Sequence, residues 1–371
     1  MSVQNSTRGD DRRERTLMRD RYEYADEIPT NFRGLHHRHL YVLSRLCGVL
    51  GRDGGQTNIG SLPRRNSAVP RSSPAPIKVL RVEILHGDCM SSRTGIRRVI
   101  VVVLDGLRPD AIDRFDLTHV YQLMSTGASS YTGTTVAPSV TTAALASLFT
   151  GVSPSRHGLT GDRVFIPRSA STLAPVPDVL ARSGFPSTAF LTELPAIFRG
   201  IGARVGRRLG FGTTRFVGRT AADVLTVART TLRTQRRGLI VLHWPDADRA
   251  GHDHGWMSPA YADGCRAIDS ALGALCSAAH LNDDPSTMLI ALADHGGGGI
   301  IANDHESEHH FDWTIPIAFA GLGIAPGVLD DAQLLDVPPT LLHALDIEPP
   351  MNYERRAITS IFVAAPHAAV A

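Results

Sequence analysis

The sequence predicts an α/β fold in which a mostly parallel central sheet is flanked by helices. From residue 97 onward, five uninterrupted apolar runs alternate with segments of helical character. Apolar runs without polar alternation are typical of strands buried on both faces. The alternation of strand and helix favours a parallel sheet. In addition, several runs are followed by carboxylates or histidines, as expected where ligands bind beyond the carboxyl ends of the strands.

The expected elements can be placed in chain order. Strands are expected at 99–104, 187–191, 239–243, 288–293 and 315–320, where strand-forming residues form the apolar runs. Helices are expected between and after them, at 110–126, 141–150, 172–183, 220–234, 258–281 and 337–345. Pro109 is well placed to begin the first helix, because proline is favoured at the first helical position. No internal repeat is evident.

Composition excludes several classes of protein. The chain has 371 residues, of which 43% are hydrophobic and 20% charged, so it is long and apolar enough for one large or two ordinary globular domains. A formal net charge of +2 gives no general attraction to nucleic acid or anionic membranes. The four cysteines lack CxxC spacing, which argues against a zinc knuckle or a disulfide framework.

No apolar stretch approaches the roughly 18–20 residues of a membrane helix. The first 26 residues are rich in Arg, Asp and Glu and lack the apolar region of a secretory signal. We therefore expect a cytoplasmic protein without a membrane partner.

The first 95 residues differ in composition from the rest of the chain. They are rich in arginine, with frequent Gly, Pro and Ser, and have too little apolar surface to offset the entropy lost on ordering. We expect a disordered extension at 1–95 and one folded domain at 96–365, with a small basic insert near the site at 160–236. An alternative is that the extension binds a partner such as nucleic acid, which the net charge does not favour.

Side chains suited to metal binding occur where the apolar runs end. Carboxylates and imidazoles ligate divalent metals. The hydroxyl of Thr141 lies at an expected helix start, after Pro138, beside free backbone N–H groups that can hold an anionic ester. Together they predict a two-metal hydrolytic site with a threonine nucleophile. The residues are Asp105, Thr141, Asp248, His252, Asp294, His295 and His305.

Each of these residues also has a purely structural interpretation. Asp105 and Thr141 could cap helices, and the four glycines after His295 could form a flexible loop instead of permitting close approach to an ion. Neighbouring residues compete for the same roles, namely Asp246, Asp253 and His254 near Asp248 and His252, and His309 and His310 near His305. The order and common location of the motifs favour the functional interpretation.

The motifs identify a resemblance that covers about residues 97–350. This region resembles the alkaline phosphatase superfamily, closest to its type I phosphodiesterase/nucleotide pyrophosphatase branch, which implies a three-layer alkaline phosphatase-like fold. The matching motifs are Val103-Leu-Asp-Gly-Leu-Arg108, Thr141 ten residues before Gly151, Ser153-Pro-Ser-Arg-His-Gly158, Asp248-x-x-Gly-His252, Asp294-His295-Gly296, His305 shortly before Thr314-Ile-Pro316, and Asp336-Val-Pro-Pro-Thr-Leu-Leu342.

The resemblance implies two divalent metal ions, usually Zn²⁺ in this branch, with Mn²⁺ or another divalent ion as alternatives. One ion would be held by Asp248, His252 and His305. The other would be held by Asp105, Asp294 and His295 together with the oxygen of Thr141, the implied nucleophile. The implied substrate is a small-molecule phosphate ester. The oligomeric state is not indicated.

The chain departs from the family pattern in its substrate-binding positions. Ala144 stands where nucleotide pyrophosphatases place an Asn, and Leu145 is apolar where sulfatases have a basic residue. Arg108 and Arg163 are candidates for a phosphate-binding arginine. We therefore expect a phosphodiesterase/nucleotide pyrophosphatase-like hydrolase. The alternatives are a phosphomonoesterase, a phosphonate or sulfate-ester hydrolase, or a metal-binding homologue that has lost catalysis.

Overall fold

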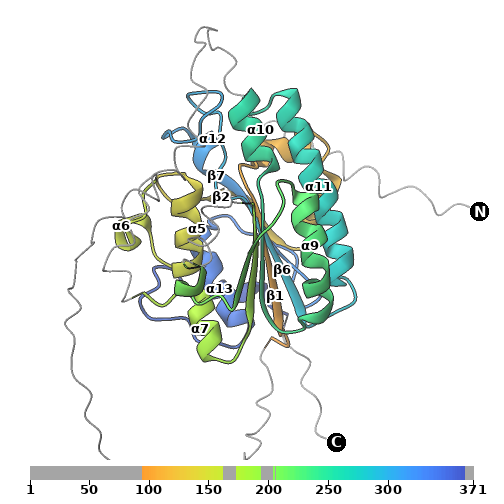
Figure 1. Ribbon diagram of the computed structural model, residues 1–371, viewed down its shortest axis with the longest axis vertical. Helices are drawn as coiled ribbons and strands as arrows, with labels where there is room; N and C mark the ends of the chain where they lie inside the picture. Colours follow the sequence, from red (N-terminus) through yellow and green to blue (C-terminus); the bar gives the residue numbers. More distant parts are fainter. Residues whose placement is uncertain (1–93, 162–172, 194–203, 205, 364–371) are drawn as a thin grey trace, which may run out of the picture.

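The computed structural model describes residues 94–161, 173–193, 204 and 206–363. Within them the α/β fold class is confirmed: an eight-stranded sheet in the order β4-β3-β5-β1-β6-β7-β2-β8 lies between helices on both faces (Figure 1). The extension expected at 1–95 lies almost wholly outside the described residues.

The five expected strands are all present, with ends that shift by one residue at most. β7 is antiparallel to both neighbours, β6 and β2, and all other paired strands are parallel. The sheet is therefore mostly parallel, as predicted. The strands are β1 (Arg98–Leu104), β2 (Ala128–Thr134), β3 (Ser187–Leu191), β4 (Thr213–Phe216), β5 (Gly238–Trp244), β6 (Thr287–Leu292), β7 (Thr314–Ala320) and β8 (Gly327–Val328).

Three strands were not expected from the sequence, because they lack an apolar run. β2 reads Ala-Ser-Ser-Tyr-Thr-Gly-Thr, and it is held by its pairing with β7 on one side and β8 on the other. The hydroxyl of Ser129 is buried and donates to the Met124 carbonyl at 2.8 Å, which satisfies it inside the sheet. Tertiary pairing thus decides the structure of a segment whose composition does not.

Helices form the two outer layers. α9 and α11 lie on one side of the sheet, with α4 packed against α11, and α5, α7 and α13 lie on the other (Figure 1). No helix in the described segments is both long and apolar enough to cross a membrane. The helices are α3 (Pro109–Arg114), α4 (Thr118–Thr126), α5 (Thr141–Thr150), α6 (Pro154–His157), α7 (Val176–Arg182), α9 (Ala221–Thr234), α10 (Asp246–His254), α11 (Pro259–Ala279), α12 (His310–Trp313) and α13 (Val337–Ala344).

One expected helix is divided in the structure. The single helix expected at 110–126 is broken into α3 and α4, because Asp116 adopts a left-handed conformation with φ of +54°. The described parts of 160–236, expected as an insert, supply β3 and β4 to the sheet and α7 and α9 to its two helical layers. They are elements of the sheet architecture, and 162–172, 194–203 and residue 205 lie outside the described residues.

Arg98 closes the end of the sheet opposite the strand carboxyl ends. Its side chain is fully buried, and its guanidinium donates to the carbonyls of Leu232 at 2.6 Å and Ala279 at 2.8 Å. These carbonyls lie in the last turns of α9 and α11, where helix geometry leaves carbonyls without intrahelical partners. The guanidinium therefore satisfies both helix ends.

Gly106 joins the loops that follow β1 and β5. Its φ is +71°, and a Cβ at this position would lie 2.7 Å from the Cα of Asp248. The Asp248 amide donates to the Asp105 carbonyl at 3.0 Å, and Trp256 and Tyr261 both donate to the Gly106 carbonyl at 2.9 Å. The two loops can approach this closely only because position 106 has no side chain.

We predict that Gly106→Ala lowers the free energy of unfolding by about 3 kcal/mol, because it adds a steric clash with Asp248 to the strain of a left-handed alanine. Gly184→Ala is the matched control: Gly184 has φ of +73°, and a Cβ added there would have no atom within 4 Å. The control should lose about 1 kcal/mol. Urea denaturation measures both, and equal losses would contradict the role of the close approach.

Candidate metal centre

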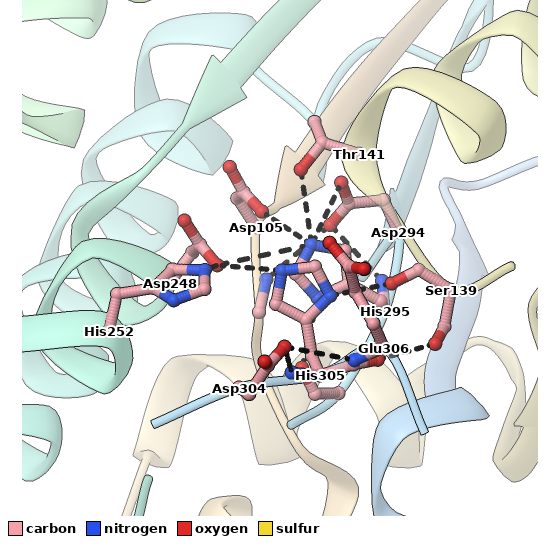
Figure 2. Close-up of polar contacts among 12 residues, drawn as sticks. Asp105, Ser139, Thr141, Asp248, His252, Asp294, His295, Asp304, His305 and Glu306 are labelled. Carbon is pink, nitrogen blue, oxygen red and sulfur yellow. Dashed lines mark hydrogen bonds and ion pairs between the residues drawn. The ribbon is translucent and has the colours of Figure 1, made fainter. Parts of the chain in front are cut away.

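The side chains singled out in the sequence converge at one edge of the sheet. Figure 2 shows them pointing toward one another. Strands β1, β5 and β6 end at this edge, and antiparallel β7 begins there, so the loop before β7 reaches the same place. The loops after β1 and β6 supply Asp105, Asp294 and His295, α10 supplies Asp248 and His252, the loop before β7 supplies His305, and the start of α5 supplies Thr141.

Asp248, His252 and His305 form one group of potential metal ligands. Their ligand atoms all lie within 4.8 Å of one another. Asp248 Oδ1 is 3.2 Å from His252 Nε2 and 3.9 Å from His305 Nε2. The spacing of four residues between Asp248 and His252 places both on the same side of α10, as helix geometry dictates.

The second group surrounds His295, whose side chain is fully buried. Its Nε2 lies 3.1 Å from Thr141 Oγ1, 3.3 Å from Asp105 Oδ1 and 3.7 Å from Asp294 Oδ2. Ligands on a tetrahedral zinc ion with bonds of about 2.0–2.1 Å are separated by about 3.3 Å. The ligand atoms of His295, Asp105 and Asp248 all lie within 4.8 Å of one another, and those of Asp294 form a second such group with Asp105 and His243.

Backbone carbonyls fix the orientation of three of the imidazoles. Nδ1 of His295 contacts the Gly296 carbonyl at 2.9 Å, Nδ1 of His305 contacts the Ser139 carbonyl at 2.6 Å, and Nδ1 of His252 contacts the Asn303 carbonyl at 3.1 Å. A carbonyl only accepts, so each Nδ1 carries the proton. In the neutral form of each ring, Nε2 then carries the lone pair, the arrangement typical of metal-ligating histidines.

The metal-free cluster carries a strong excess of negative charge. Burial, and then the charge of Asp105, raise the pKa of Asp294 to about 7. Although burial opposes protonation of His295, the surrounding carboxylates, first Asp294, raise its pKa well above the usual value. In the absence of a cation, protons therefore take up part of the charge that a cation would neutralise.

Asp105 and His305 are held in their ligand forms. Burial and the charge of Asp248 act to raise the pKa of Asp105, but contacts with His243 and His295 outweigh them and lower it to about 2. Burial, followed by the charge of His295, lowers the pKa of His305 to about 4. An ionised carboxylate and a neutral imidazole are the forms that bind metal.

Two carboxylate oxygens in the cluster have no hydrogen-bond partner among the described residues. They are Asp105 Oδ1 and Asp294 Oδ2, and both are buried. A buried, ionised oxygen without a partner carries a large desolvation penalty. Carboxylate oxygens combined with imidazole nitrogens suit zinc and related divalent ions. The donor set therefore fits divalent cations.

The competing candidates have other roles. Asp246 accepts a hydrogen bond from the Ala221 amide at 2.7 Å, at the start of α9. Asp253 and His254 are exposed. His309 caps α12, because its Nδ1 accepts from the Phe311 amide at 3.2 Å. The cluster thus contains Asp248 and His305 instead of these neighbours.

His243 joins the cluster and was not anticipated from the sequence. It lies within β5, is 8% exposed, and places Nε2 3.1 Å from Asp105 Oδ2. Its Nδ1 lies 3.0 Å from the hydroxyl of Thr192, just after β3. In the sequence, position 243 falls at the end of an apolar run that predicts a strand. A histidine inside such a run, one residue before the strand end, was the available signal.

Arg108 does not point into the cluster. It pairs with Asp110, donates to the Gly297 carbonyl at 3.2 Å, and stacks 3.6 Å above the Phe311 ring. It therefore holds the glycine-rich loop after β6 in place. A Cβ at Gly296 would lie 1.9 Å from the Phe311 carbonyl oxygen, so this loop is tightly packed. Arg163, the other candidate arginine, lies outside the described residues.

The helix that begins at Thr141 is braced at two points. In its middle, the buried Ser147 hydroxyl contacts Nε2 of His157 at 2.9 Å, which ties α5 to α6. At its end, Gly151 adopts a left-handed conformation against the ring of Tyr353. Ala144 is fully buried, so this position presents no group to the cluster.

Comparison with known proteins agrees with this geometry. A family model described as type I phosphodiesterase / nucleotide pyrophosphatase matches residues 99–177 and 208–314. Among curated proteins, the 2,3-bisphosphoglycerate-independent phosphoglycerate mutase of Roseobacter denitrificans is 27% identical over 124 residues, which are 33% of this chain and 24% of that protein. The corresponding mutase of Pseudoalteromonas translucida is 28% identical over 131 residues, 35% of this chain and 24% of that protein. The matched region spans about a quarter of these relatives.

Solved structures share the fold. One neighbour is murine ectonucleotide pyrophosphatase / phosphodiesterase 5, solved as an inactive threonine-to-alanine variant in complex with AMP. It superposes on this chain with a TM-score of 0.56 at 16% sequence identity, and the match covers 72% of this chain and 100% of that one. A 2-O GAG sulfatase superposes with a TM-score of 0.56 at 12% identity, covering 71% of this chain and 73% of that one. At these identities the likeness establishes the common fold.

We predict that Asp294→Asn has opposite effects without and with zinc. Since the pKa of Asp294 is about 7 in the folded metal-free protein and about 3.9 in an unfolded chain, its ionisation destabilises the metal-free fold progressively from about pH 4 to pH 7. At pH 8 the metal-free variant should be more stable than the wild type, by on the order of 2 kcal/mol. The difference should vanish toward pH 4.

Zinc should reverse this order. A cation at 1,000 times its dissociation constant stabilises the wild type by about 4 kcal/mol, and the variant should gain less. Thermal unfolding across pH with chelator and with zinc measures both effects. Asp269→Asn is the control, since this buried carboxylate accepts from the Val120 amide at 2.8 Å outside the cluster; its effect should not depend on zinc. A metal-free Asp294→Asn protein less stable than the wild type at pH 8 would contradict the prediction.

Proposed function

The chain belongs to the type I phosphodiesterase/nucleotide pyrophosphatase family of the alkaline phosphatase superfamily, and from this we propose that it is a metal-dependent hydrolase of phosphate esters with a preference for diesters. The observation that carries the proposal is the position of Thr141. Its hydroxyl lies at the first position of α5 and 3.1 Å from His295 Nε2, within the carboxylate–imidazole cluster.

We assign the cluster to two divalent cations. Asp248, His252 and His305 would hold one of them. The remaining ligands, Asp105, Asp294 and His295 together with Thr141, would hold the other. When bound, the cations would act as Lewis acids that stabilise negative charge on the attacking and leaving oxygens and lower the pKa of coordinated hydroxyl groups. Zinc is the cation that best suits this mixture of carboxylate and imidazole.

Thr141 would act as the nucleophile in two steps. In the first, its hydroxyl loses a proton, its oxygen bonds to phosphorus, and the bond from phosphorus to the leaving oxygen breaks, so that the released alkoxide takes up one proton and departs as the alcohol. In the second, the oxygen of a water molecule bonds to phosphorus and the bond to Thr141 breaks, which restores the hydroxyl. The braces that His157 and Tyr353 provide to α5 would keep the hydroxyl in position for both steps.

The first turn of α5 would bind the non-bridging oxygens of the ester. Its first backbone N–H groups have no intrahelical acceptors, and they lie at the positive end of the helix dipole. Ala144 and Leu145 stand where relatives would offer a polar or basic side chain to the ester, and Ala144 is buried. Arg108 pairs with Asp110. A diester, with one negative charge, suits such neutral donors better than a doubly charged monoester.

The substrate class can be tested directly. We expect zinc-supplied protein to hydrolyse an aryl phosphodiester faster than the corresponding phosphomonoester, phosphonate or sulfate ester, by at least 10-fold in kcat/KM. Metal content measured on the same sample ensures that a slow rate is not caused by missing cation. Faster turnover of the sulfate or the monoester would assign the chain to that activity, and no turnover of any ester would indicate a metal-binding homologue without catalysis.

We predict that Thr141→Ala lowers kcat on the preferred ester at least 1,000-fold, because it removes the nucleophile while the carboxylates and imidazoles stay in place. Thr142→Ala is the matched control: it removes the adjacent hydroxyl of the same helix turn and should keep activity within about 3-fold. Acid quenching followed by mass spectrometry should detect a phosphoryl group on the wild-type peptide that contains residue 141. Equal activity in Thr141→Ala and the wild type would exclude a threonine nucleophile.

A further inference from the structure

Asp312 is a buried carboxylate that belongs to neither of the two assigned cation groups. It lies in α12, just before β7, and is 1% exposed. Its Oδ1 accepts a hydrogen bond from the Gly299 amide at 2.8 Å, and its Oδ2 accepts from the Ser307 amide at 3.0 Å and from the Ser307 hydroxyl. Because a buried carboxylate is costly unless it is hydrogen-bonded, these donors hold it firmly in place.

The carboxylate of Asp312 closes the loop from Gly299 to Ser307. The residues that donate to it stand at the two ends of this loop, so one side chain fixes both ends. The approach is close, because a Cβ at Gly299 would lie 2.7 Å from Asp312 Oδ1. A glycine at position 299 is therefore what allows the carboxylate to reach the loop backbone.

The closed loop carries or contacts both imidazoles of the Asp248 group (Asp248, His252 and His305). His305 is a member of the loop. The carbonyl of Asn303, also in the loop, contacts Nδ1 of His252 at 3.1 Å. The shape of the loop therefore influences where both Nε2 atoms lie, although Asp312 touches neither ring.

His305 is held from a second direction by Ser139. The Ser139 hydroxyl donates to the His305 carbonyl at 2.5 Å, and Nδ1 of His305 donates to the Ser139 carbonyl at 2.6 Å (Figure 2). Ser139 thus ties His305 to the segment before α5, whereas Asp312 ties the loop that carries His305 to the segment before β7. Two elements from different parts of the chain together set the position of this ligand.

The loop that carries Asp294 and His295 is held by other bonds. The Gly296 amide donates to the backbone carbonyl of Asp312 at 2.9 Å, and the Gly297 amide donates to the Phe311 carbonyl at 2.8 Å. Changing only the side chain of Asp312 leaves both bonds in place. Loss of this carboxylate should therefore disturb the Asp248 group more than the ligands around His295.

We propose that Asp312 is a positioning residue for the cation of the Asp248 group, an inference that rests on the two-cation assignment of the proposed function. By closing the loop in the metal-free protein, Asp312 holds His305 and His252 in their ligand positions before a cation binds. Without the carboxylate, the cation must order the loop as it binds, which lowers its affinity.

Zinc binding to the full-length protein tests the proposal. Protein stripped with chelator is dialysed against increasing Zn²⁺, and bound zinc is measured by mass spectrometry. We expect two equivalents for the wild type. Asp312→Asn should keep one of them with unchanged affinity and bind the other at least about 10-fold more weakly, because the asparagine NH2 donates and cannot accept from the loop amides. Asp269→Asn, a buried carboxylate outside the cluster, is the control and should leave both affinities unchanged.

Two further variants separate positioning from a general loss of structure. Ser307→Ala removes the hydroxyl donor and keeps the amide, so it should weaken the same equivalent by about 3-fold without threatening the fold. His305→Ala removes the ligand itself, and adding Asp312→Asn to it should cause little further loss, because both changes act on one site.

The outcomes distinguish this inference from the proposed function. Unaltered affinities in Asp312→Asn and Ser307→Ala, equal weakening of both equivalents, or an additive effect of Asp312→Asn and His305→Ala would overturn the role of Asp312. A wild type that binds fewer than two equivalents would contradict the cation assignment on which both rest. Since no substrate is involved, a protein that shows the expected zinc affinities but hydrolyses no ester would contradict only the proposed function.

Discussion

The mutual repulsion of three buried carboxylates is the constraint on which the rest of the site depends. Asp105, Asp248 and Asp294 are each less than 8% exposed, and they lie within a few ångströms of the same imidazoles. Ionised groups this close together inside a protein oppose folding unless opposite charge is present. In the metal-free protein, protonation of His295 and Asp294 supplies part of that charge. Divalent cations would supply more of it, so that folding and metal binding would favour the same arrangement.

Stabilising contacts elsewhere in the fold offset the repulsion among these carboxylates. β1 is buried along its whole length at the centre of the sheet, and Arg98 secures the opposite edge through the ends of α9 and α11. With that core in place, the edge that carries the carboxylates can be highly charged without unfolding. Gly106 marks the boundary between the two regions: its carbonyl binds Trp256 and Tyr261 of the scaffold, and its missing side chain admits Asp248 to the cluster.

The parts of this structure that depend on local patterns could be predicted from the sequence. Buried parallel strands are apolar throughout, so five strands could be located, and the residues after them fell at one edge because parallel strands share their direction. Features that depend on a partner could not be predicted in this way. β2 is polar and forms through pairing with β7, and the break at Asp116 arises from a single left-handed residue. His243 was missed because it lies inside a strand and not in the loop that follows it, and only the pairing of β5 with β1 brings it beside Asp105.

Asp105 has a central position in the cluster that follows from topology. β1 lies between β5 and β6, so a residue at its end has neighbours on both sides: α10 and His243 from β5, and Asp294 and His295 from β6. An edge strand would have such neighbours on one side only. A carboxylate has two oxygens, and at this position each faces a different imidazole. The strand order of the sheet thus explains why Asp105 contacts one imidazole from the strand on one side and another from the loop that follows the strand on the other side.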